Sequence, residues 1–218
     1  MYDLCKCATW NCYRSEGTMQ YTGERIIPEH AGKAAQGNID IHDLMYREFL
    51  VAVENKLVLD IACGCGMGTK MLASRALRVH GYDIDKESID FAKEHYNGLN
   101  IKYDVGDIKQ IPEIDSLFDT VVSVETFEHV ENVENVISEV YRVLKPNGIW
   151  CFTTPNGERY PDHKIVKYHV KHYTEKELHS LLDSKFEIYV RKTGLEPDMT
   201  VYFKRPTFGN YSVFGVKK

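Results

Sequence analysis

Residues 57–68 read LVLDIACGCGMG, and this stretch decides the fold. Its first part, Leu57–Ile61, is a short and nearly continuous apolar run, which is typical of a parallel strand covered on both faces. Its second part places Gly64, Gly66 and Gly68 just where a helix is expected to begin, near Met67. A strand, a glycine loop and a helix in this order predict a β-α unit whose loop lets the backbone approach a ligand closely.

The chain that follows repeats this alternation. The apolar spacing predicts strand Arg78–Asp83, helix Lys86–Tyr96, a strand near Ile101, strand Asp119–Val124, helix Glu131–Leu144 and strand Ile149–Thr153. Each right-handed crossover must return over one face of the sheet to start the next parallel strand. The alternation therefore predicts a doubly wound, Rossmann-like α/β fold.

The two ends of the chain differ from this pattern. Residues 1–38 show no sustained period, so we expect an N-terminal arm there and a single domain over residues 39–218. From Ile39 the apolar residues recur at helical spacing, and we expect a helix that ends near Asn55. A helix opened by a Thr174 capping box precedes two β-prone runs, Phe186–Val190 and Tyr211–Val216, which we expect to pair antiparallel at the sheet edge.

Composition narrows the class of protein. The chain has 218 residues, of which 43% are hydrophobic, and its net charge is −5. These values are typical of a globular domain and disfavour nucleic acid or an anionic membrane as a partner, unless a local basic patch exists. No apolar run is long enough to span a bilayer and the start lacks the features of a signal peptide, so we expect a cytoplasmic protein. The positions of its six cysteines suit reduced thiols better than disulfides.

The glycine loop and three strand ends predict a nucleoside site. Asp83 ends the second strand, where an acid accepts both hydroxyls of a ribose, and Gly106-Asp107 follows the third strand, where a carboxylate accepts an amine such as that of adenine. The loop reads Gly-x-Gly-x-Gly with Asp60 before it, whereas a dinucleotide fingerprint reads Gly-x-Gly-x-x-Gly. Because a carboxylate at Asp60 would oppose a pyrophosphate, the ligand is expected to lack phosphate and to carry a cationic end.

These motifs, with Phe118–Glu125 and Leu144–Gly148, resemble the ordered motifs of class I S-adenosylmethionine-dependent methyltransferases of the type 11/23 kind. The resemblance implies a seven-stranded sheet of order 3-2-1-4-5-7-6 whose last strand is antiparallel. It also implies S-adenosylmethionine as cofactor. The methionine part would lie against Asp60 and the glycines, the ribose at Asp83, the adenine on Ile84 and its amine at Asp107. The full set of implied cofactor residues is Tyr21, Asp60, Ala62, Gly64, Gly66, Gly68, Asp83, Ile84, Gly106, Asp107, Ile108 and Glu125. The segment Tyr21–Pro28 is similar to one that precedes this domain in some bacterial methyltransferases of cell-surface sugar or small-molecule pathways.

Methyl transfer to a hydroxyl needs a group that removes the proton, because the sulfonium already provides an excellent leaving group. Glu125, Glu128 and His129 follow the fourth strand at the edge where open α/β sheets bind ligands. His129 is the natural base, since an unperturbed imidazole is neutral at cytoplasmic pH.

The Glu-x-x-Glu-His order also resembles a divalent-metal motif of ubiquinone-biosynthesis O-methyltransferases and of small-RNA 2′-O-methyltransferases. That resemblance implies a site for Mg²⁺ or Mn²⁺ made by Glu125, Glu128, His129 and His169. The chain departs from the RNA motif at Tyr168 and Lys171, where an acid and an aromatic residue are expected.

The acceptor stays open among several classes. We expect a hydroxyl of a small molecule or sugar, and the alternative is a metal-dependent RNA 2′-O-methyltransferase, for which the basic segment His163–His172 would receive an anionic acceptor. An NAD-dependent oxidoreductase would explain the strand-end acids but not Asp60. A noncatalytic adenosyl-binding module would explain the loop without requiring Glu125 or His129.

Overall fold

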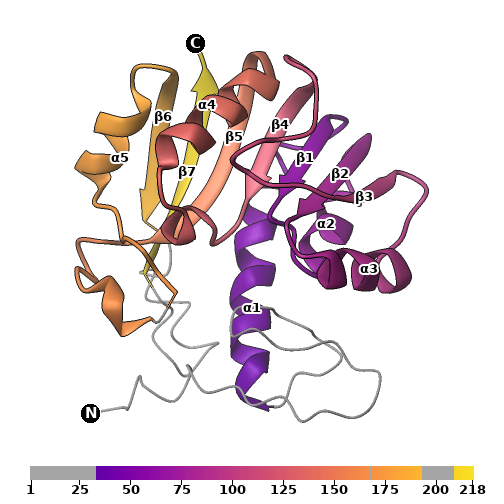
Figure 1. The fold of residues 1–218 in the computed structure, drawn as a ribbon, viewed down its shortest axis with the longest axis horizontal. Helices are drawn as coiled ribbons and strands as arrows, with labels where there is room; N and C mark the ends of the chain where they lie inside the picture. The colour runs from indigo at the N-terminus through magenta and orange to yellow at the C-terminus, as the bar shows by residue number, and fades with distance from the viewer. Residues whose placement is uncertain (1–32, 167, 193–208) are drawn as a thin grey trace.

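The computed structural model describes residues 33–166, 168–192 and 209–218. They form a seven-stranded sheet of order β3-β2-β1-β4-β5-β7-β6 with helices on both faces (Figure 1). The strands are β1 Leu57–Ile61, β2 Arg78–Asp83, β3 Ile101–Val105, β4 Phe118–Ser123, β5 Leu144–Pro155, β6 Phe186–Lys192 and β7 Asn210–Lys217. The helices are α1 Lys33–Glu48, α2 Met67–Leu72, α3 Lys86–His95, α4 Val133–Val143 and α5 Glu175–Leu182, with 3₁₀ turns η3 Phe127–His129 and η4 His163–Ile165.

Strand β1 lies at the centre of the parallel part of the sheet. It pairs in parallel with β2 on one side and β4 on the other, and Val58, Leu59 and Ile61 are fully buried. Strand β7 runs antiparallel to both β5 and β6. The predicted doubly wound sheet, its order and its antiparallel last strand are therefore confirmed.

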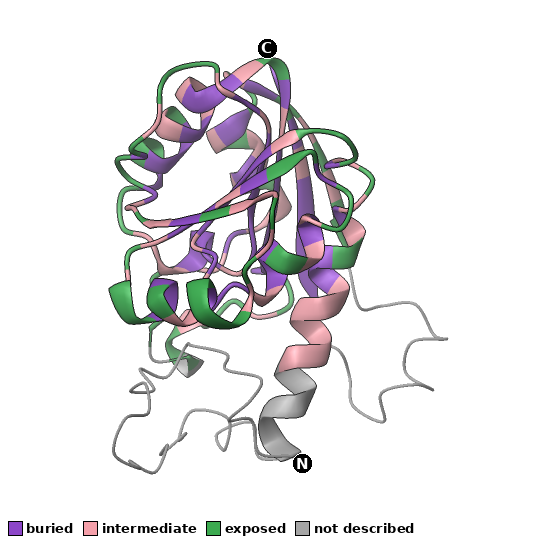
Figure 2. Ribbon diagram, turned by 90° about the vertical axis from the view of Figure 1, so that its right-hand side faces the viewer, coloured by how far each residue is buried: buried purple, intermediate pink, exposed green. Residues whose placement is uncertain are grey.

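Two layers of helices cover the sheet. Helices α4 and α5 pack on one face around Val136, Val140 and Leu178, and α1 and α2 pack on the other around Phe49 and Leu72. Figure 2 shows the buried residues concentrated in the strands and along the inner sides of the helices. Each apolar helical stripe thus lies against a sheet face, as the 3.6-residue period requires.

The first helix differs from its prediction at both ends. It begins at Lys33, so it crosses the predicted boundary between arm and domain, and it ends at Glu48 rather than near Asn55. Residues 49–55 form turns, yet Phe49 and Val53 are fully buried in them. The apolar spacing that predicted a longer helix reflects burial of a turn. Residues 1–32, with Tyr21, Cys5, Cys7 and Cys12, lie outside the described residues.

Other boundaries move by a few residues. Helix α4 begins after Asn132, which has a left-handed backbone with φ 58°, and β5 begins at Leu144 rather than Ile149. The register between β4 and β5 shifts at this irregular start, where Asn147 has φ 60°. The Thr174 capping box is present as predicted: the Glu177 amide donates to Thr174 Oγ1 at 3.2 Å, and the Thr174 amide donates to Glu177 Oε2 at 2.8 Å.

Two further sequence predictions can be compared with the described residues. Cys63, Cys65 and Cys151 are buried and carry reduced thiols, as predicted for these three positions. Among the described helices, none combines the length and the apolar character that a membrane-spanning segment requires.

Candidate active site

The carboxyl ends of the parallel strands meet at one edge of the sheet, and the predicted site residues lie there. Figure 1 shows α1 and the segment that contains η4 at this same end of the sheet. In the glycine loop, Gly64 and Gly66 have φ 54° and 89°, in the region that favours glycine. A Cβ on Gly64 would meet nothing within 4 Å, so this part of the loop borders open space. The geometry suits a backbone cradle for a ligand.

The other two glycines have packing roles. A Cβ on Gly66 would lie 2.7 Å from Ala92 Cβ, and a Cβ on Gly68 would overlap the ring of Tyr46. Gly68 thus lets α1 approach the start of α2. The sequence motif alone does not reveal this contact, because Tyr46 lies on a helix far from the loop in sequence.

We expect the Gly68→Ala substitution to lower the free energy of unfolding by about 1–3 kcal/mol, the usual cost of overpacking a core. Urea unfolding measures this difference. The same substitution in a Tyr46→Ala background should cost less, because the overlapping ring is absent. An equal cost in both backgrounds would contradict the packing role of Gly68.

Asp60 is fully buried at the end of β1. Thr69 Oγ1 donates to its Oδ2 at 2.5 Å and Tyr46 Oη donates to its Oδ1 at 3.3 Å. Burial, the largest effect, raises the pKa of Asp60 from 3.8 to about 7, although both hydrogen bonds favour the charged form. Tyr46 and Thr69 are site residues that sequence reasoning missed, and they hold Asp60 at the loop.

The raised pKa predicts a pH dependence of stability. Between about pH 4 and pH 7 the folded state retains a proton that the unfolded chain has released, so the Asp60 carboxyl lowers the free energy of unfolding as pH rises through this window. Asn cannot ionise. We therefore expect the stability of Asp60→Asn, relative to wild type, to increase with pH across this window and to level off above it. Urea unfolding of both proteins at several pH values checks this, and a difference that is flat with pH would contradict it.

Asp83 links the second strand to the glycine loop. The Gly64 amide donates to its Oδ2 at 2.8 Å, and the Asp85 amide donates to its Oδ1 at 2.9 Å. An ionised carboxylate offers about four acceptor positions, so these bonds orient the group and leave capacity for ribose hydroxyls. The next residue, Ile84, is 69% exposed, so its side chain is accessible at this edge of the sheet.

The segment after β3 divides into exposed and packed parts. Asp107 accepts a hydrogen bond from the Lys109 amide at 2.8 Å, which fixes its carboxylate in a turn. Ile108 is 9% exposed and belongs to the main core, and a Cβ on Gly106 would lie 2.7 Å from Tyr82. Packing therefore accounts for Gly106 and Ile108, whereas Asp107 is half-buried in a turn and does not belong to the core.

Glu125 stands apart from the other predicted metal ligands. It has a left-handed backbone with φ 49°, and its Oε1 accepts a hydrogen bond from Thr153 Oγ1 at 2.8 Å. Burial raises the pKa of the Glu125 carboxyl to about 7. The ligand atoms that lie near one another come from Glu128, His129 and His169 without Glu125. The predicted four-residue set is thus reduced to three among the described residues.

Glu128, His129 and His169 each offer one ligand atom, and these atoms lie within 4.8 Å of one another. Glu128 is fully buried, with Oε2 accepting from Thr154 Oγ1 at 3.0 Å and Oε1 lying 3.8 Å from His129 Nε2. The Val170 amide donates to the Glu128 carbonyl at 2.8 Å and so joins η3 to the segment that carries His169. This link explains how residues distant in sequence share one site.

Hydrogen bonds indicate which nitrogen of His129 carries a proton. Its Nδ1 lies 3.2 Å from the Tyr168 carbonyl oxygen, which only accepts, so Nδ1–H is the donor. In the neutral ring the lone pair is then on Nε2, the atom that faces Glu128. Burial and the neighbouring imidazoles lower the pKa of His169 to about 3, which keeps that ring neutral. Two imidazole rings that each offer a nitrogen lone pair beside a carboxylate form a donor set that binds cations.

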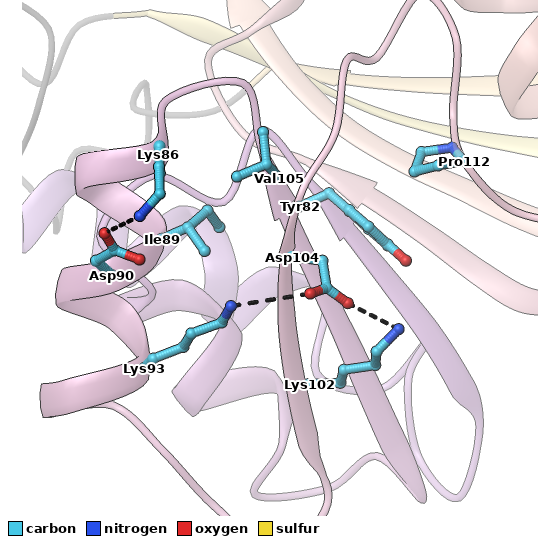
Figure 3. Close-up of a pocket in the computed structure, with 9 residues that line it drawn as sticks. All are labelled: Tyr82, Lys86, Ile89, Asp90, Lys93, Lys102, Asp104, Val105 and Pro112. Atoms are coloured by element: carbon cyan, nitrogen blue, oxygen red, sulfur yellow. Dashed lines mark hydrogen bonds and ion pairs between the residues drawn. The ribbon is translucent and has the colours of Figure 1, made fainter.

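Two surface grooves lie outside the Glu128–His129–His169 cluster. One, of about 510 Å³, is lined by α3 and β3, and Figure 3 shows Lys86 directed to Asp90, with Lys93 and Lys102 directed to Asp104. Because these charges pair with one another and no predicted site residue lines the groove, it gives no support for a ligand site. The second, of about 630 Å³, lies between the start of α4 and α5.

Comparison with known proteins gives a consistent result. Residues 59–152 match the model of a family described as a methyltransferase domain. The chain is 30% identical over 77% of its length to a probable S-adenosylmethionine-dependent methyltransferase of Mycolicibacterium smegmatis, of which it covers 65%. It is 33% identical over 46% of its length to a fatty-acid O-methyltransferase of the same organism, of which it covers 38%. It is 34% identical over 52% of its length to a ubiquinone biosynthesis O-methyltransferase of Coxiella burnetii, of which it covers 49%.

A solved structure supports the fold. The complex between the Haloferax volcanii Trm112 methyltransferase activator and a methyltransferase contains a chain that matches with TM-score 0.69 at 20% identity, over 84% of this chain and 92% of that one. With the sheet order and the glycine loop, these matches support a class I S-adenosylmethionine-dependent methyltransferase domain, of which residues 59–152 carry the match to the family model. The chain spans less than two thirds of the length of the curated relatives it matches.

Proposed function

We propose that this protein transfers a methyl group from S-adenosylmethionine to a hydroxyl of a small molecule or sugar, with His129 as base or metal ligand. The observation that carries the proposal is the orientation of His129: its Nδ1 lies 3.2 Å from the Tyr168 carbonyl oxygen, and its Nε2 faces Glu128 at the end of β4. Strand β4 pairs with β1, which ends in the glycine loop. His129 and the glycine loop therefore follow the ends of neighbouring strands.

Bound S-adenosylmethionine supplies an electrophilic methyl group on a sulfonium. Asp60 and the Gly64 region would hold its methionine part, Asp83 its ribose and Asp107 its adenine amine. His129 Nε2 would take the hydroxyl proton as the acceptor oxygen bonds to the methyl carbon and the carbon–sulfur bond breaks. S-adenosylhomocysteine leaves, and the proton remains on the imidazole until solvent removes it.

The same donor set fits a divalent cation. Two imidazole lone pairs and a carboxylate oxygen within 4.8 Å repel one another unless a cation lies among them. Glu128, His129 and His169 would hold such an ion, for instance Mg²⁺ or Mn²⁺, and two nitrogen ligands suit manganese better than magnesium. A cation there would lower the pKa of a hydroxyl placed beside it.

The charged residues in and near the basic segment give less support to an RNA acceptor. Lys171, in the basic segment His163–His172, lies 2.7 Å from a carboxylate oxygen of Glu177, and Lys192 nearby lies 3.1 Å from Glu158. Cations neutralised by neighbouring acids attract phosphates weakly. The fatty-acid and ubiquinone names of two relatives favour small-molecule acceptors.

The test is transfer of tritiated methyl from labelled cofactor into fractionated host extract. We expect label in the small-molecule or glycan fraction, and label confined to RNA or protein would overturn the proposed acceptor class. Parallel reactions with EDTA, and with Mn²⁺ restored, separate the two roles of His129. Loss of transfer with EDTA and its recovery with Mn²⁺ would support the cation site, whereas unchanged transfer would leave His129 as a base alone.

A further inference from the structure

A chain of two hydrogen bonds runs from the backbone into the Glu128–His129–His169 cluster. His172 Nδ1 lies 2.7 Å from the Tyr160 carbonyl oxygen, and His172 Nε2 lies 2.6 Å from His169 Nδ1. The rings of His169 and His172 are also in edge-to-face contact, with centroids 4.9 Å apart. His172 therefore lies outside the cluster and contacts it through a hydrogen bond to His169 Nδ1.

The direction of each hydrogen bond follows from the carbonyl at its end. A carbonyl oxygen only accepts, so His172 Nδ1 must donate to Tyr160. In the neutral His172 ring, Nε2 then carries a lone pair and accepts from His169 Nδ1–H. His169, neutral in turn, carries its lone pair on Nε2. A single fixed carbonyl thus determines the tautomers of both rings.

The backbone around Tyr160 is well held, which gives the chain a fixed origin. The Tyr160 amide donates to the Asn156 carbonyl at 2.9 Å, and the Gly157 amide donates to the Tyr173 carbonyl at 2.9 Å. These bonds hold together the two ends of the segment between β5 and α5 and so close it into a loop. A Cβ on Gly157 would lie 2.7 Å from the Tyr173 backbone, so only glycine permits this closure.

We infer that His172 is a positioning residue that fixes His169 in the tautomer with its lone pair on Nε2, the nitrogen that the bond to His172 leaves for the Glu128–His129–His169 cluster. The inference rests on the proposed function, because it assigns His172 to the same site. Partners of this kind orient metal-binding imidazoles, and their loss typically costs about tenfold to a hundredfold in metal affinity. The two histidines of the cluster are then oriented alike: His129 through the Tyr168 carbonyl, His169 through His172.

Long-range proton–nitrogen NMR of the protein without metal tests the inference directly. We expect His169 in wild type to carry its proton on Nδ1, and assignment uses the signals lost in His169→Asn. The His172→Gln variant retains an acceptor oxygen near the position of Nε2 and should keep this tautomer. The His172→Phe variant retains a ring without an acceptor, and we expect His169 to shift toward the Nε2–H tautomer. The His163→Phe variant is the control, since it removes a neighbouring imidazole, 6.4 Å from His172 between centroids, and leaves the chain of bonds in place.

Titration with Co²⁺, followed by its visible absorption, provides a second measurement. We expect affinity to fall about tenfold to a hundredfold in His172→Phe and to be recovered in His172→Gln. A wild-type His169 with its proton on Nε2, or a His172→Phe variant with unchanged tautomer and affinity, would overturn the inference. If wild type binds no Co²⁺, the cation part of the proposed function fails. The NMR result alone then supports or overturns the role of His172.

Discussion

Replacing His129 by Ala is expected to lower methyl transfer by about 10²- to 10⁴-fold, the usual contribution of a positioned general base. The imidazole presents Nε2 at the end of β4, and alanine offers no atom that takes a proton or binds a cation. Binding of S-adenosylhomocysteine should be retained, because the glycine loop and Asp83 are untouched. Single-turnover transfer and calorimetric titration measure the two effects separately.

The control for His129 is His179→Ala. His179 is paired with Asp183 on α5 at 3.1 Å, and neither residue belongs to the site. We expect its transfer rate to equal that of wild type. Transfer within a few-fold of wild type by the His129→Ala variant would remove His129 from the reaction. A wild-type chain that binds S-adenosylhomocysteine but transfers no methyl group would instead favour a noncatalytic adenosyl-binding module.

The second large effect is expected at Asp83. Its carboxylate would accept two ribose hydroxyls, and it already orients Gly64 through a bond of 2.8 Å to the Gly64 amide. Hydrogen bonds to charged groups contribute about 1.5–3 kcal/mol each, so the loss of two in Asp83→Ala should weaken S-adenosylhomocysteine binding by roughly 10²- to 10⁴-fold. Calorimetric titration measures the dissociation constant directly.

Asp90→Ala provides the matched control. This acid lies on α3, pairs with Lys86 and is exposed, so its loss should leave the affinity unchanged. Thermal unfolding of both variants shows whether the fold persists. An Asp83→Ala variant that folds and binds within twofold of wild type would place the ribose elsewhere.

The sheet could be predicted from the sequence because its signals are local. Leu57–Ile61 is apolar enough to indicate a strand buried on both faces, and the Lys-Pro-Asn-Gly sequence at residues 145–148 indicates that α4 ends before it. The end of α1 could not be predicted in this way. Phe49 and Val53 continue the apolar spacing of the helix while lying in turns. These two residues are therefore buried without being helical.

The site was predictable to the extent that its residues follow strand ends. Asp60, Asp83 and Glu128 come directly from that rule. Glu125 and Glu128 are equivalent in the motif, and only the fold separates them, since Glu125 bonds to Thr153 and Glu128 lies beside the histidines.

The residues that sequence reasoning missed act through contacts distant in sequence. Tyr46, on α1, donates a hydrogen bond to Asp60 on β1. His172 bonds to His169 within a histidine-rich stretch, and the spacing of these histidines does not indicate how their rings are oriented. In the sequence, the concentration of histidines in this stretch was the signal that pointed to His172. Hydrogen-bond direction, which assigns the role of His172, exists only in the folded chain.

Calorimetric titration of the purified chain with S-adenosylhomocysteine and, in parallel, with NAD tests the central claim most directly. Asp60 lies buried before the glycines, where its ionised carboxylate would favour a cationic methionine and oppose a pyrophosphate. We expect saturable binding of S-adenosylhomocysteine that is weakened in Asp83→Ala, and no comparable binding of NAD. Tighter binding of NAD would contradict the assignment of a methyltransferase cofactor to this loop.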